Sequence, residues 1–174
     1  MPATNTAPQI NHDDLTLEEL FALAQDKSSE GRQTLFENMR DMFLDNGRSV
    51  SDRERALMSE ILRRLVHDVE KKLRKSLAEN LSKRSDTPHA LIVELANDEF
   101  EVAHPILIES NVLQDQDLIE NINHRTMEHQ LAISMRKNLS EDVSEALVET
   151  GEQDVIANLL NNHGAKISRH VMDY

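Results

Sequence analysis

The pair His67-Asp68 brings together two side chains suited to chemistry, and Lys71, Lys72 and Arg74 follow it on an expected helix. An exposed histidine followed by an acid is what dimerising histidine kinases phosphorylate. Such a histidine in a helical bundle can relay a phosphoryl group without a cofactor of its own. The sequence therefore offers His67 as a candidate phosphoacceptor.

The remaining parts of a phosphorelay protein are missing. No threonine-proline stands within the few residues after His67, no glycine-rich ATP lid occurs, and the lysine and glycine that closely follow the histidine of phosphotransfer domains are absent. The alternative is a solvated histidine at a junction between two helices, with Asp68 as the N-cap of the second helix. Both interpretations stay open on the sequence alone.

His124, Glu128 and His129 form the one cluster of potential metal ligands in the sequence. His124 and Glu128 would share a helical face, but neither HExxH nor HxxEH occurs, and a catalytic zinc needs three ligands and an open position. A polar transition from loop to helix explains the cluster more simply. We therefore predict no metal site here.

Other catalytic chemistries find little support. The chain has no cysteine, and its four scattered glycines exclude a glycine-rich phosphate loop. Acid pairs such as Glu18-Glu19 and Glu141-Asp142 say nothing about acid-base catalysis, because a raised pKa needs burial. We predict a protein without catalytic residues or a cofactor.

The charge is strongly negative and unevenly distributed. The net charge of -13 comes from 32 acids and 19 bases, and a surface this negative repels nucleic-acid phosphates. The net charge is -5 over residues 1–50, +4 over 51–84 and -12 over 85–174. The five aromatic residues also provide no platform for stacking bases. Nucleic-acid binding is therefore disfavoured.

Acidic side chains on residues 85–120 are the candidates for binding a protein partner with a basic surface. Glu94, Glu101 and Asp117 represent this region, which contains no lysine or arginine. The alternative is that the basic residues just before it neutralise these acids within the fold. Those residues are Lys71, Lys72, Lys75, Lys83 and Arg84.

The elements that must position these residues are helices, because four glycines and four prolines leave almost no turn chemistry for strands. We expect a disordered leader over residues 1–12, an N-terminal helical segment over 13–50 and a helical-repeat domain over 51–174. Thr16 with Glu19 and Ser51 with Glu54 have the spacing of capping boxes. The apolar stripe after Ser51 predicts either one long helix or two helices joined near His67-Asp68.

The second half of the chain repeats itself, with anchors separated by 29, 29 and 24 residues. The anchors are Leu73, Val102, Leu131 and Val155, and the second apolar positions are Leu77, Ile106, Met135 and Leu159. A last helical pattern begins near Ala165 with Ile167 and Val171. Paired helices of this kind bury their apolar faces by stacking into a solenoid, although an irregular bundle is the alternative.

Four segments carry a resemblance to a known family: RERALMSEILRRLVHDVEKKLRKSLAENL (53–81), LANDEFEVAHPILIES (95–110), DLIENI (117–122) and LSEDVSEALVETGEQDVIANLLNN (139–162). In order and spacing they resemble the alphaproteobacterial domain-of-unknown-function family 2336, over roughly residues 50–174. The resemblance implies HEAT-like helical repeats in a cytoplasmic bacterial protein and no established catalytic residue. Because members commonly continue further, it also predicts a shortened chain.

Together these observations predict an all-α protein: a HEAT-like solenoid preceded by a short helical segment. We expect a non-enzymatic scaffold whose acidic surface binds a protein partner, with a phosphorelay protein using His67 as the alternative. No run of apolar residues is long enough for a spanning helix, and the lack of cysteine fits a reducing compartment, so we expect a cytoplasmic protein. An apolar stripe at Ile167 and Val171 with nothing after it would favour a homo-oligomer.

Overall fold

The computed structural model describes residues 22, 24–45 and 49–169, and in these residues it is helical with no strand. The α-helices are α2 (Ser29–Leu44), α3 (Asp52–Leu65), α4 (Lys71–Leu81), α5 (His89–Ala96), α6 (Phe100–Glu109), α7 (Asp115–His124), α8 (Met127–Ser134), α9 (Glu141–Glu149) and α10 (Gln153–Leu160). A 3-10 helix, η1 (Val66–Asp68), follows α3. The all-α prediction is confirmed, while the expected leader over 1–12 and the Thr16 capping box lie outside the described residues.

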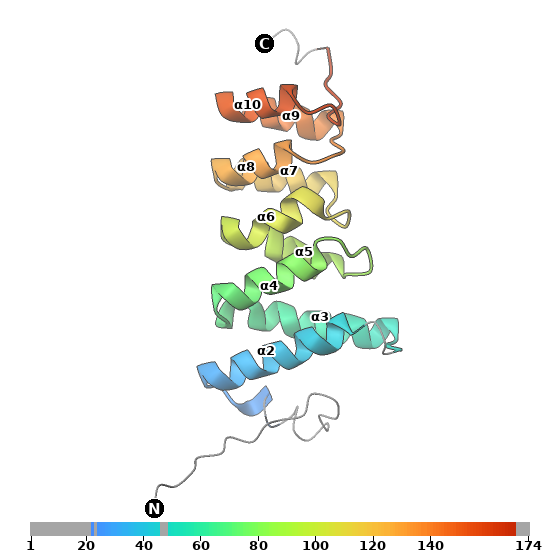
Figure 1. Ribbon diagram of the computed structural model, residues 1–174, viewed down its shortest axis with the longest axis vertical. Helices are drawn as coiled ribbons and strands as arrows, with labels where there is room; N and C mark the ends of the chain where they lie inside the picture. Colours follow the sequence, from blue (N-terminus) through green and yellow to red (C-terminus); the bar gives the residue numbers. More distant parts are fainter. Residues whose placement is uncertain (1–21, 23, 46–48, 170–174) are drawn as a thin grey trace, which may run out of the picture.

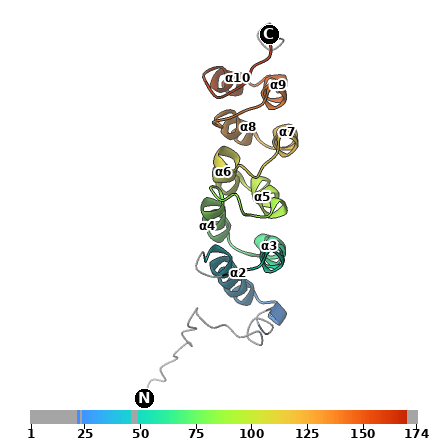
Figure 2. The same ribbon diagram turned by 90° about the vertical axis from the view of Figure 1, so that its right-hand side faces the viewer.

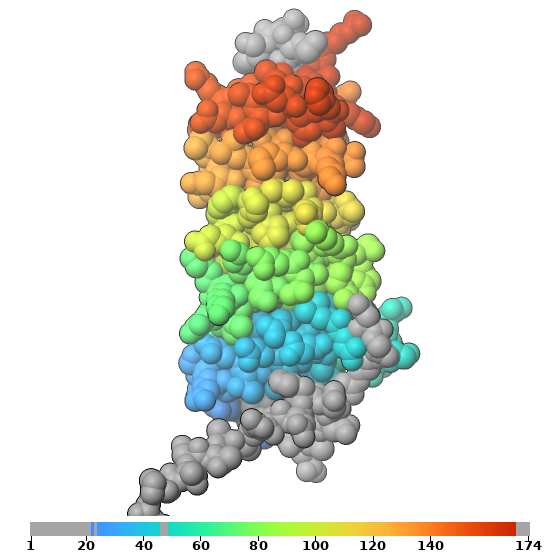
Figure 3. All heavy atoms as spheres, in the orientation of Figure 1, coloured from blue at the N-terminus to red at the C-terminus, as the bar shows by residue number. Residues whose placement is uncertain are grey.

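The helices stack in two rows along the long axis of the molecule (Figure 1). Seen from the side, α4, α6, α8 and α10 form one row and α3, α5, α7 and α9 form the other (Figure 2). Contacts follow the same order, since α4 packs on α6, α6 on α8 and α8 on α10. Each helix of this row thus packs on the next-but-one helix of the chain, and Figure 3 shows the resulting bands of colour in sequence order.

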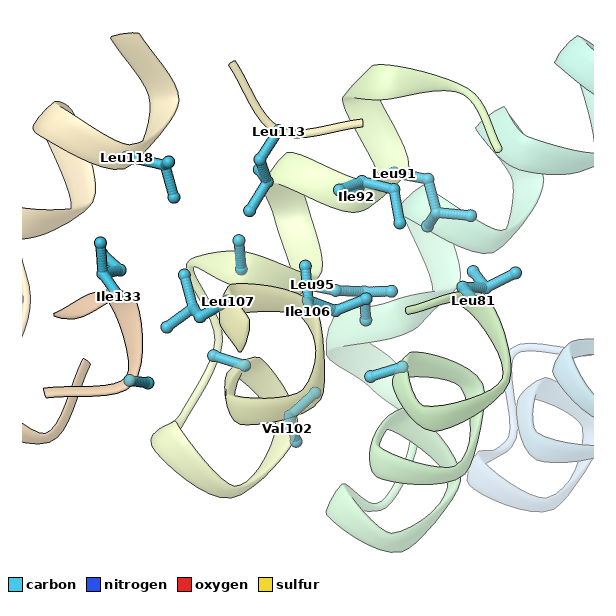
Figure 4. Packing of buried hydrophobic residues seen from close by; sticks show 14 of the residues in the cluster. Leu81, Leu91, Ile92, Leu95, Val102, Ile106, Leu107, Leu113, Leu118 and Ile133 are labelled. Atoms are coloured by element: carbon cyan, nitrogen blue, oxygen red, sulfur yellow. The ribbon is translucent and has the colours of Figure 1, made fainter. Parts of the chain in front are cut away.

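One continuous core runs between the two rows, from Leu35 in α2 to Leu159 in α10. Leu95 of α5 lies beside Ile106 of α6, and Leu107 faces the side chains of the following layer (Figure 4). Each such leucine or isoleucine, fully buried, contributes about 1.5–3 kcal/mol relative to an exposed one. Because α2 belongs to this core, it is the first layer of the stack that the structure describes.

Local signals in the sequence set several helix boundaries. The Ser51 capping box forms, with the Glu54 amide donating to the Ser51 hydroxyl and the Ser51 amide donating to Glu54 Oε2 at 2.9 Å. The long stripe after Ser51 divides into α3 and α4, as one of the two alternatives predicted. The prediction that Asp68 caps α4 is wrong, because Asp68 belongs to η1 and accepts from Arg32, while Glu70 is the N-cap.

The predicted repeat register is right for three layers and wrong for the fourth. Leu77, Val102, Ile106, Val155 and Leu159 are buried, Leu73 and Leu131 are partly buried against the core, and Met135 is 50% exposed. In α8 the buried positions that match those in α6 and α10 are His129 and Ile133. The predicted anchor lies two residues too late in the chain, at Leu131. The anchor position is held by a histidine, His129, and a search for apolar residues does not select it.

Polar side chains reach back one layer to the carbonyl groups at the ends of preceding helices. Asn121 donates to the Ala96 carbonyl at 2.8 Å, and Arg136 donates to the carbonyls of Leu107 and Ser110. Asn162 donates to the carbonyls of Ser134 and Arg136, both at 2.7 Å. These bonds satisfy acceptors that an α-helix leaves free at its end, and they join each layer to the one before it.

The chain after α10 differs from the sequence prediction. Residues 165–169 are not helical; Ala165 forms an isolated parallel bridge with Leu139, and Ile167 packs against the core. The predicted helix is therefore wrong over these residues, and Val171 lies outside the described part. No helix in the described part is both long and apolar enough to cross a membrane.

Candidate functional site: an acidic groove beside Phe100

A groove with a volume of about 840 Å³ lies at the amino-terminal ends of α6 and α8. It brings together residues from η1, the α5–α6 turn, the start of α6, the α7–α8 turn and the start of α8. They are His67, Asn97, Asp98, Glu99, Phe100, Glu101, His124, Arg125, Thr126, Glu128 and His129. Several residues that the sequence singled out separately, including His67, Glu101 and His124, thus line one groove.

Four carboxylates and one guanidinium line this groove, which makes it acidic. Glu99 and Glu101 are exposed, and Lys71 bridges them, with Nζ 3.5 Å from Glu99 Oε2 and 3.0 Å from Glu101 Oε1. The hydrogen bond from Lys71 lowers the pKa of Glu101, and a hydrogen bond from Thr126 lowers the pKa of Glu128. Glu101 and Glu128 are therefore ionised at neutral pH.

Asp98, the fourth carboxylate, anchors the α5–α6 turn. Its side chain is 11% exposed and accepts from Arg74 Nε at 2.8 Å and from Arg74 Nη2 at 3.2 Å. Arg74 also donates to the Val69 carbonyl, and its side chain is 13% exposed. This two-point contact fixes the groove wall at the start of α6.

Phe100 provides the aromatic part of the groove, with histidines edge-on to its ring. The ring centroids are 5.2 Å from His104 and 5.7 Å from His129. His129 is buried, with Nε2 3.0 Å from the Asp98 carbonyl oxygen and Nδ1 2.9 Å from the Thr126 hydroxyl. Because a carbonyl only accepts, Nε2 carries a proton, and His129 joins α8 to the α5–α6 turn.

The potential metal ligands meet in the groove but have other partners. His124 Nδ1 is 2.8 Å from the Glu120 carbonyl of its own helix, and both nitrogens of His129 are engaged. Within the described residues no three histidine, cysteine, aspartate or glutamate side chains are placed to hold a metal ion. The cluster instead shapes the wall of the groove.

His67, the candidate phosphoacceptor, lies in η1 at the rim of the groove. Its side chain is 70% exposed, and Nε2 donates to Glu94 Oε1 at 2.7 Å. Arg63 Nη1 lies 3.7 Å from the other oxygen of Glu94. His67 is thus accessible to other molecules and oriented by a carboxylate.

The three acids proposed from the sequence do not share one site. Glu101 lines the groove, while Glu94 pairs with His67 and Arg63 outside it. Asp117 accepts from His89 Nε2 at 2.7 Å and from the Gln114 amide at 2.8 Å, which caps α7. Each of the three therefore has a partner within the fold.

Part of the basic block neutralises the following acids, as one of the two alternatives predicted. Lys71 pairs with Glu99 and Glu101, Arg84 with Asp86, and Lys83 lies 3.8 Å from Glu109. The pairs of Lys71 and Lys83 join α4 and the loop after it to the start and end of α6, whereas the Arg84–Asp86 pair lies within that loop. Of the acids that line the groove, Glu99 and Glu101 thus already have a basic partner within the fold.

Sequence reasoning missed the turn Asn97-Asp98 and Phe100. The Asn97 side-chain oxygen accepts from Asn121 and from Arg125, both at 3.3 Å, so the next layer holds this turn in place. The signal in the sequence was a polar Asn-Asp-Glu run directly before an apolar helix, which marks a turn between paired helices. Nothing in the sequence showed that Arg125 and His129 return to the same place.

Comparison with curated proteins and with solved structures gives no significant match. Residues 102–174, from α6 to the end of the chain, match the family DUF2336, described as an uncharacterised protein conserved in bacteria, and this confirms the family resemblance predicted from the sequence over that part of the chain.

Proposed function

We propose that this protein is a non-enzymatic, HEAT-like helical-repeat scaffold that binds a basic segment of a partner protein in the groove beside Phe100. The observation that carries the proposal is the lining of the groove, with four carboxylates, one arginine and an aromatic ring. Lysine or arginine side chains of a partner would meet Glu101 and Glu128, and Phe100 would offer a ring to a cation. The two-row stacking of paired helices supports the repeat assignment.

The geometry favours recognition over catalysis. Arg74 and His129 hold the α5–α6 turn from two neighbouring layers, so the acids on it are presented from a rigid frame. A rigid frame reduces the entropy lost when a partner binds. We propose a cytoplasmic location on the composition alone, since a chain without cysteine needs no oxidising compartment.

The test is a titration of the isotopically labelled protein with a short peptide containing lysine and arginine, followed by backbone amide shifts. Saturable shifts at residues 97–101 and 126–129 that weaken with salt are expected for the wild type. The variant Glu99→Gln, Glu101→Gln, Glu128→Gln should lose them, because the complementary charge is removed.

The matched control is Glu141→Gln, Glu149→Gln, Glu152→Gln, which changes the net charge equally on exposed acids of α9 and the turn after it. This control should bind the peptide like the wild type. Equal loss of binding in both variants, or shifts spread over all the acidic helices, would show that the groove is not the binding site.

A second function is a phosphorelay through His67, and it is favoured by one observation. In the neutral ring with Nε2 donating to Glu94, the lone pair of Nδ1 is available on an exposed side chain. Nδ1 would attack the phosphorus of a phosphodonor and form a bond to it. The donor's leaving group would depart with the electron pair of its bond to phosphorus.

Incubation with a small phosphodonor would test this function. His67→Ala should abolish acid-labile labelling, while His89→Ala, a second exposed histidine paired with a carboxylate, should keep it. If the wild type is not labelled, or if the two variants are labelled alike, His67 is excluded as the phosphoacceptor.

A further inference from the structure

A second pocket lies at the opposite, carboxyl-terminal ends of α4, α6 and α8 and has a volume of about 430 Å³. Its lining is basic, in contrast to the groove beside Phe100. The residues are Lys83, Ile108, Glu109, Asn111, Met135, Arg136, Lys137 and Asn138. Three cations and a single carboxylate therefore gather in one place on a chain whose net charge is -13.

Arg136 is the unusual residue of this pocket, because it is a buried cation. Its exposed fraction is 7%, and its two terminal nitrogens donate to backbone carbonyls of Leu107 and Ser110. Nε is buried and has no hydrogen-bond partner, and Arg136 forms no ion pair in the part of the chain that the structure describes. Burial lowers the pKa of Arg136, and only the more distant Asp115 opposes this effect.

Such a cation is costly unless a negative charge comes near it. The carbonyl groups at the end of α6 supply partial negative charge, but a full charge buried without a counter-ion remains unfavourable. Lys137 is exposed beside Arg136, and Lys83 points its largely exposed side chain to the same pocket, with only a long 3.8 Å contact to Glu109. Two exposed lysine side chains thus share this pocket with a buried guanidinium.

We propose that this pocket binds an oxyanion, either a phosphate or a carboxylate group, with Lys83 and Lys137 as direct donors and Arg136 as the buried positive charge behind them. The amides of Asn111 and Asn138 supply further donors at the rim. The site is independent of the acidic groove, since none of these residues lines it.

The test is a titration of the labelled protein with inorganic phosphate and, separately, with acetate, at constant ionic strength set by sodium chloride. Saturable shifts are expected at the amides of Asn111, Lys137 and Asn138. The variant Lys83→Gln, Lys137→Gln should weaken binding about tenfold or more, because two charge-assisted donors are lost. Arg136 is left in place, because its replacement would also uncap α6.

The matched control is Lys72→Gln, Lys75→Gln, which removes the same charge from exposed positions of α4 outside the pocket. Saturation by phosphate alone supports a phosphate site, saturation by acetate alone supports a carboxylate site, and saturation by both supports a site that accepts either oxyanion. Shifts that do not saturate with either anion, or equal weakening in both variants, would overturn the proposal.

Discussion

At the scale of single residues, Glu60 shows how strongly an exposed carboxylate can depend on its neighbours. Arg63 donates to Glu60 Oε2 at 3.0 Å, and Arg64 donates to Oε1 at 2.8 Å, both within α3. These hydrogen bonds, that from Arg63 first, lower the pKa of Glu60 from 4.5 to about 2. The folded protein therefore releases the Glu60 proton more readily than the unfolded chain does.

The variant Glu60→Gln should be less stable than the wild type at neutral pH. A lowered carboxyl pKa stabilises the fold above the unfolded pKa and loses this effect as pH falls to the folded pKa. The stability difference should thus be constant above pH 4.5 and vanish as pH falls to about 2. Urea denaturation of both proteins at a series of pH values measures it.

Glu79→Gln in α4 is the control, because the Glu79 carboxylate forms no ion pair among the described residues. Its stability relative to the wild type should vary less with pH than that of Glu60→Gln. A stability difference for Glu60→Gln that does not change with pH would contradict the pairing with Arg63 and Arg64.

At the scale of the helix, the register of α8 makes a sharp comparison possible. Ile133 is fully buried, while Met135, two residues later, is half exposed. Ile133→Ala should cost about 2–5 kcal/mol through lost contacts and a cavity. Met135→Ala should cost less than about 0.5 kcal/mol, as is usual at the surface. Denaturant melts of the two variants compare them, and equal losses would restore the register expected from the sequence.

The turn after α10 gives a second test at this scale. The Gly164 amide donates to Asn162 Oδ1 at 2.9 Å, and a Cβ at Gly164 would lie 1.7 Å from the Lys137 carbonyl oxygen. Gly164→Ala must therefore displace backbone, and we expect a loss of about 1–3 kcal/mol. Ala157→Gly, at an exposed position of α10, provides a scale for helix propensity, about 1 kcal/mol. A Gly164→Ala protein as stable as the wild type would show that this close approach is absent.

The sequence predicts helices better than it predicts which layer a polar residue joins. The capping residue Ser51 was recognised because such a signal acts within four residues. Asn121, His129 and Arg136 occupy inward positions that a hydrophobic pattern assigns to apolar side chains. Their acceptors lie 25 to 31 residues away in the chain. Hydrophobic periodicity carries no information about such distant partners. The residues that form the wall of the candidate groove could therefore not be predicted from it.

At the scale of the whole molecule, the core is deepest in the middle of the stack. The buried apolar residues of α5 and α6 are almost completely inaccessible, whereas α10 buries only Val155 and Leu159. Amide hydrogen exchange should therefore be slowest in α5 and α6 and faster in α2 and α10, because outer layers open with fewer lost contacts. Equal protection in all helices would indicate that the stack opens as a single unit.

The polar side chains that reach back to the preceding layer have a mechanical consequence. Asn121, Arg136 and Asn162 connect layers along the long axis, and the main packing partners of every helix are near neighbours in the chain. A pulling force applied to the two ends of the described stack would therefore load the layer interfaces in series. The weakest interface would separate first while the others stay closed. The molecule would therefore lengthen in discrete steps, one layer interface at a time.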